Sequence, residues 1–254
     1  MVKRHPLITF FVLAYALSWW EWPLHAVGLF PGPILPYGPM IAAFIILALT
    51  KGKAGVKALL RSMVQWRAGL NWYAVALGLP AVLYLAAVCL NVLLGAAIPT
   101  SAQLSVPWYM LVLAFPLTIL ESGALEEPGW RGYALPRLLA HRSALAASLI
   151  LGAVHAGWHL PLYNVATPAL AYIPLVIGWS VLFTWLFNGT NGSVLLAILF
   201  HGSLNTLAGL LQPMFSGEDA VRLFWLLAAA FCVAAVVVAL AAGPELSRKP
   251  SPHT

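Results

Sequence analysis

PWYMLVLAFPLTILESGALEEPGWRGYALPRLL, residues 107–139, is a long apolar stretch in which two adjacent carboxylates, Glu126 and Glu127, are followed by Arg131. Its length suits a membrane-spanning helix, because about 20 apolar residues cross the hydrocarbon core of a bilayer. Charged side chains within such a span are costly and usually mark a functional site. The stretch therefore predicts a membrane fold and also the region where its chemistry takes place.

The apolar character extends along the whole chain, which is 62% hydrophobic and only 8% charged. Soluble domains carry about 25% charged residues. Nearly uncharged runs recur from end to end, which predicts an all-α, polytopic membrane bundle of about eight transmembrane helices. We expect one integral-membrane domain over residues 1–254, with its core motifs within 107–212. The expected spans are 7–29, 33–50, 71–97, 107–139, 143–162, 170–188, 193–212 and 222–242.

The positive charges predict the orientation of these spans. Twelve of the 13 lysines and arginines fall on one side of an eight-span topology, and only Arg222 falls on the other. Cytoplasmic loops are rich in lysine and arginine, so both termini are expected in the cytoplasm. This topology accounts for the net charge of +6 without nucleic-acid binding. The basic segment 51–67 is expected to be an amphipathic helix on the cytoplasmic membrane surface.

Glu126 and Glu127 are expected to lie deep in their span. An apolar pattern continues beyond Arg131, so we extend the helix to residue 139, with Pro128 expected to kink it. Glu126 then lies about 20 Å from the cytoplasmic end, at about 1.5 Å of rise per residue. Glu127 and Arg131 are four residues apart and can pair, whereas Glu126 points about 100° away from Glu127.

Polar groups occur at comparable depth on two other spans. His155 and His159 share one helix face, and so do His201 and Asn205, because each pair is four residues apart. A carboxylate, histidines and a carboxamide can activate water and stabilise an oxyanion, which favours a hydrolytic site. A proton-coupled transporter and a non-catalytic membrane scaffold remain alternatives. We find no internal repeat of the kind that many transporters contain.

Together these motifs resemble the CPBP family of intramembrane proteases, which includes the type II CAAX prenyl endopeptidases. The family motifs are EExxxR, FxxxH and Hxxx(N/D). In this chain they correspond to Glu126, Glu127 and Arg131, to His159 within Trp-His-Leu-Pro, and to His201 and Asn205.

The resemblance implies an intramembrane endopeptidase in which Glu126 and His159 activate water. It implies that His201 and Asn205 bind the oxygen that becomes the oxyanion. Glu127 and Arg131 complete the first motif, with Arg131 expected to be a positioning partner. The chain departs from the family at the aromatic position of FxxxH, which is His155; we interpret this histidine as a substitute for the aromatic ring, the alternative being a further polar ligand.

For the cofactor, the sequence is compatible with two alternatives. Glu126, His159 and His201 could form a three-ligand zinc site, or Glu126 and His159 could activate water without a metal. The resemblance implies a membrane-associated peptide or protein substrate. Prenylated CAAX proteins are the precedent, and peptide precursors or the tails of membrane proteins are the alternatives. No nucleic-acid partner is expected, because the topology accounts for the positive charge. The small, basic chain favours the inner or plasma membrane of a prokaryote.

Overall fold

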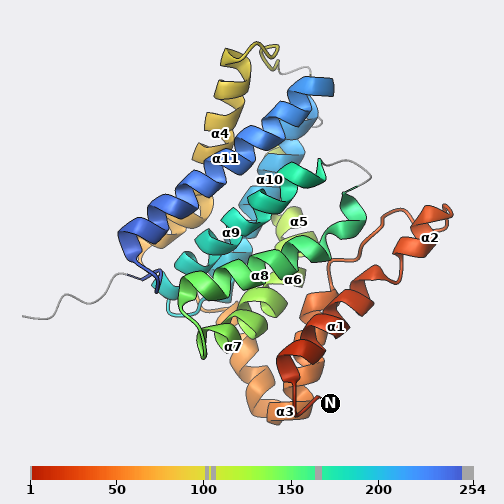
Figure 1. Ribbon diagram of the computed structural model, residues 1–254, viewed down its shortest axis with the longest axis vertical. Coiled ribbons are helices and arrows are strands. Elements are labelled where there is room, and N and C mark those ends of the chain that lie inside the picture. Colours follow the sequence, from red (N-terminus) through yellow and green to blue (C-terminus); the bar gives the residue numbers. More distant parts are fainter. Residues whose placement is uncertain (1, 101–102, 104–106, 164–167, 248–254) are drawn as a thin grey trace, which may run out of the picture.

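The fold is an all-helical bundle, as the sequence predicts (Figure 1). The computed structural model describes residues 2–100, 103, 107–163 and 168–247, and contains no strand in these ranges. Within them, six helices are long and apolar enough to cross a membrane, so the chain is an integral membrane protein. These helices are Pro6–Ala26, Gly38–Met63, Leu70–Leu93, Leu170–Gly189, Val194–Met214 and Gly217–Ala242.

The N-terminal boundaries differ from those expected. The first span, Pro6–Ala26, is not one unbroken helix over 7–29 but consists of α1 (Pro6–Trp19) followed by the short α2 (Trp22–Ala26). The next helix begins at residue 38 rather than 33. Three prolines, at positions 31, 33 and 36, explain the later start, because proline restricts the preceding residue and lacks the N–H that a helix interior needs.

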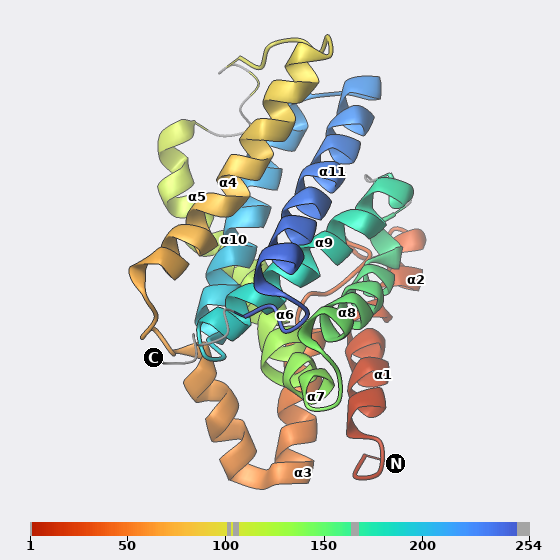
Figure 2. The same cartoon turned by 60° about the vertical axis from the view of Figure 1, so that its left-hand side comes forward.

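The helix α3 (Gly38–Met63) bends sharply at Gly52, and Figure 2 shows its two arms. Gly52 has φ 60° and ψ −155°, a conformation that side-chain-bearing residues rarely adopt. The arm that follows corresponds to the predicted amphipathic helix. The expected span and surface helix are therefore two arms of one element joined by a glycine.

The remaining long helices follow the predicted spans closely. Four helices surround one apolar core: α4 (Leu70–Leu93), α9 (Ala169–Gly189), α10 (Val194–Leu211) and α11 (Gly217–Ala242). The shorter α8 (Ala144–Trp158) packs against α9 and continues into a 3₁₀ turn at Leu160–Leu162. A second core joins α1 and α3 to α8 and to the segment around Trp130.

The stretch 107–139 is a helical path with changing geometry. After a 3₁₀ turn it contains α5 (Leu111–Thr118), α6 (Ala124–Gly129) and α7 (Leu135–Leu139). Two π-helical turns separate them, η3 (Ile119–Gly123) and η4 (Trp130–Ala134). Such turns are rare and often occur at functional sites. That this path and α8 both cross the membrane, completing eight spans, stays a prediction.

Close packing fixes α6 between α3 and α10 (Figure 2). A Cβ atom added to Gly129 would lie 2.5 Å from the backbone of Pro39 in α3, so α3 and α6 touch without an intervening side chain. We expect Gly129→Ala to lower the free energy of unfolding by about 1–3 kcal/mol. Thermal unfolding of the purified protein would measure this loss.

Gly78 in α4 is the matched control, because an added Cβ atom meets nothing within 4 Å there. Gly78→Ala is expected to be neutral or stabilising by up to about 1 kcal/mol, since alanine favours helix. Equal unfolding temperatures for the two variants would contradict the assigned contact.

Candidate active site

The two carboxylates of α6 are inside the protein. Glu127 is fully buried and Glu126 is 5% exposed. The π-helical turns on either side of α6 change the rotation of the helix next to these residues, and Pro128 removes one backbone donor between them. As predicted from their phase, the two side chains have different partners. One belongs to an ion-pair cluster and the other faces a cavity.

Glu127 forms the centre of the ion-pair cluster. Its Oε1 accepts a hydrogen bond from Arg131 Nη1 at 2.9 Å, which confirms the predicted pair. The same oxygen lies 2.7 Å from His201 Nδ1 on α10, which donates its proton. The Arg131 guanidinium lies 3.9 Å from the centre of the Phe183 ring on α9. Glu127 thus joins three elements and fixes the orientation of His201.

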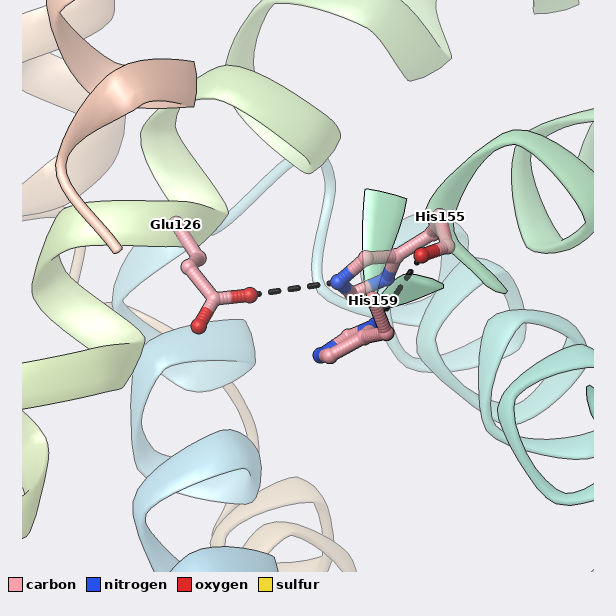
Figure 3. Close-up of side chains that lie close together, drawn as sticks. All are labelled: Glu126, His155 and His159. Atoms are coloured by element: carbon pink, nitrogen blue, oxygen red, sulfur yellow. Dashed lines mark hydrogen bonds and ion pairs between the residues drawn. The ribbon is translucent and has the colours of Figure 1, made fainter. Parts of the chain in front are cut away.

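Glu126 points the other way, towards the two histidines at the end of α8 (Figure 3). Its Oε2 lies 3.1 Å from His155 Nε2. His159 Nδ1 donates to the carbonyl oxygen of His155 at 2.9 Å, which leaves the lone pair of His159 on Nε2. The two imidazole rings lie 4.7 Å apart. On this side, Glu126 therefore has both His155 and His159 as neighbours.

A cavity of about 360 Å³ brings the remaining groups together. Glu126, His159, His201 and Asn205 all line it, as the sequence predicted from their depth. His201 Nε2 lies 3.9 Å from Glu126 Oε1, so this histidine connects the cluster of Glu127 with the cavity. The cavity wall also includes apolar and aromatic side chains from α8, the 3₁₀ turn that follows it, α9, α10 and the loop before α3: Ile34, Pro36, Trp158, Leu162, Tyr172, Trp179, Phe183 and Leu204.

Residues 106–207 match the family described as type II CAAX prenyl endopeptidase Rce1-like. This segment belongs to the CAAX protease-like family. A curated relative, the CAAX prenyl protease 2 of Methanococcus maripaludis, is 29% identical over 99 residues. That alignment covers 34% of this chain and 36% of the relative, so it spans about a third of the relative's length.

All six predicted site residues fall within the CAAX protease-like segment and around one cavity or its adjoining ion pair. Two further residues belong to the site. Glu121, to which the sequence assigned no role, lies in the π-helical turn η3 and lines the cavity with an exposed side chain. His155 is in hydrogen-bonding contact with Glu126, which favours the alternative of a further polar ligand over the ring substitute that we preferred. Its spacing of four residues from His159 was the available signal.

His155 nevertheless also packs as an aromatic ring would. Its ring centre lies 4.9 Å from that of Trp130. The two interpretations of this residue are therefore not exclusive, because the ring stacks within the core while Nε2 reaches the carboxylate.

The ligand groups of Glu126, His155 and His159 lie within 4.8 Å of one another and are all buried. This set differs from the predicted zinc ligands, in which His201 stood in place of His155. A carboxylate and two imidazoles match the donor set of many catalytic zinc sites. The residues present therefore fit a metal ion.

Proposed function

We propose that this chain is an intramembrane endopeptidase of the CAAX-protease type, which hydrolyses a peptide bond near the cytoplasmic leaflet with both termini in the cytoplasm. One observation carries the proposal: the buried carboxylate of Glu126 faces a cavity that it shares with His159, His201 and Asn205. Buried carboxylates, histidines and a carboxamide around one cavity are the groups that amide hydrolysis needs. The match of residues 106–207 favours a peptidase over a transporter.

Water activation is assigned to Glu126 and His159. In the metal-free form of the reaction, Glu126 takes a proton from water as the water oxygen attacks the carbonyl carbon of the substrate. His159 accepts a hydrogen bond from the same water at Nε2, because its Nδ1 proton is held by the carbonyl of His155. When the C–N bond breaks, the proton on Glu126 passes to the leaving amine.

Oxyanion stabilisation is assigned to His201 and Asn205. Asn205 presents an amide donor one helical turn from His201. With Nδ1 bound to Glu127, His201 directs Nε2 into the cavity, and in its protonated form it donates there to the developing oxyanion. Removal of one such donor typically lowers kcat by about 10²–10³-fold. Glu127 and Arg131 act through His201 as positioning residues.

The substrate class that suits this site is a membrane-associated peptide or protein. The CAAX precedent favours a chain with a prenyl group, which the bilayer would hold beside the cavity. If the site binds zinc, the ion would polarise the attacking water.

The test is peptide cleavage by purified protein in liposomes. A prenylated peptide ending in a CAAX sequence and its unprenylated counterpart are the substrates, and mass spectrometry identifies the products. We expect cleavage by the wild type and a loss of at least about 10²-fold in His159→Ala, because the water loses one of its two partners.

His141→Ala serves as the matched control, since His141 is exposed in the turn between α7 and α8. It should cleave at the wild-type rate. Cleavage by His159→Ala at that rate would contradict the assignment. Proton-coupled solute uptake without any cleavage would favour a transporter instead.

A further inference from the structure

The charges around the cavity are unbalanced. Glu126 and Glu121 both line it, and no lysine or arginine does so among the residues that the structure describes. Arg131 is bound to Glu127. Even with His201 protonated, the two carboxylates outnumber the cations along the cavity wall. A buried carboxylate without a matching cation is costly, so the site is electrostatically suited to bind a cation.

The donors next to Glu126 are nitrogen atoms. His155 Nε2 lies 3.1 Å from the Glu126 carboxylate, and His159 presents Nε2 with its lone pair free (Figure 3). The hydrogen bond from His159 Nδ1 to a backbone carbonyl is the arrangement that orients histidine ligands in metal proteins. Nitrogen donors beside a carboxylate favour zinc over magnesium or calcium, which prefer oxygen ligands.

We propose that Glu126, His155 and His159 form a zinc site, and that His155 is the ligand that completes it. In a tetrahedral zinc site, two ligand atoms that each lie about 2.1 Å from the ion are about 3.4 Å apart. The three ligand groups lie within 4.8 Å of one another, so side-chain rotations that bring the most distant pair closer by about 1.4 Å suffice. The cavity then offers space for a water molecule beside the ion.

This assignment differs from a site that uses His201. His201 Nδ1 is bound to Glu127, and its Nε2 is 3.9 Å from the Glu126 carboxylate, farther than His155 Nε2. His201 thus remains in the ion-pair cluster. Only the catalytic role of the zinc ion rests on the proposed function, and in that role Glu126 acts as a metal ligand. Metal binding itself can be measured without a substrate.

The experiment measures zinc in the full-length, tag-free protein in detergent, by mass spectrometry of the metal after dialysis against a weak chelator. We expect about one zinc per wild-type chain. His155→Phe keeps a ring against Trp130 but removes the nitrogen, and should bind zinc at least about 100-fold more weakly. Cobalt substitution gives a second readout, because a site with three protein ligands produces visible absorption bands that His155→Phe would lose.

Two further variants identify the ligand set. His201→Gln should retain zinc, whereas a loss equal to that of His155→Phe would assign the site to His201 and overturn the proposal. His141→Ala removes an exposed histidine and should also retain zinc. His155→Gln repeats the test with a smaller polar side chain in case the phenylalanine variant does not fold.

The zinc measurement and the cleavage assay test the metal site and the proposed function separately. Two results would overturn the metal site and leave the proposed function intact. One is a wild-type protein that cleaves peptide but binds no zinc, and the other is a His155→Phe protein that binds zinc as tightly as the wild type. Protein that binds one zinc through His155 but cleaves no peptide supports the metal site and contradicts the proposed function.

Discussion

Glu126→Gln is expected to abolish peptide cleavage, with a loss of at least about 10³-fold, while the protein stays folded in the membrane. Glutamine keeps the shape of the side chain but can neither accept a proton from water nor act as an anionic metal ligand. The loss is therefore expected whether or not zinc is bound. Among the residues that the structure describes, Glu126 has no arginine or lysine partner, so its replacement leaves neither kind of side chain unpaired in the core.

Cleavage and folding are measured on the same preparations. Purified Glu126→Gln protein is assayed against the peptide in liposomes, and membrane peptides from cells with either form are compared by mass spectrometry. Glu218→Gln makes the same chemical change at an exposed position at the start of α11 and should leave cleavage unchanged. Cleavage by Glu126→Gln within tenfold of the wild type would exclude Glu126 as an essential group.

The spans could be predicted because lipid imposes a simple rule on sequence. Every backbone polar group must be satisfied within the segment, so apolar length alone identifies helices such as α4 and α11. The break between α1 and α2 and the bend at Gly52 were not predicted. Each depends on local backbone geometry, which apolar length does not report, and a glycine in a long apolar run is as compatible with a straight helix as with a bend.

The site could be predicted in part from helix phase. The spacing of Glu127 and Arg131 predicted their ion pair, and the different direction of Glu126 predicted its separate role. The partner of Glu127 on α10 and the contact between Glu126 and His155 depend on how three helices pack. The π-helical turns on either side of α6 contribute to that packing, and no residue pattern in the stretch predicts these turns.

Arg131→Met is expected to destabilise the folded protein by about 3–5 kcal/mol, because it leaves the buried Glu127 carboxylate without its cation. Both side chains are fully buried. Arg137→Met is the control: Arg137 is half-buried, stacks 3.5 Å from the Tyr133 ring centre and bonds one carbonyl oxygen, so its loss should cost about 1 kcal/mol. Thermal and denaturant unfolding would measure both.

The double variant Glu127→Gln with Arg131→Met isolates the interaction itself. Removing both charges avoids an unpaired ion, so the double variant should be more stable than Arg131→Met alone. It should still cleave peptide poorly, because His201 loses the carboxylate that orients it. If the loss of stability in the double variant equals the sum of the losses in Arg131→Met and Glu127→Gln alone, the pair is not coupled. Full cleavage activity in the double variant would mean that Glu127 does not position His201, and the two results are independent.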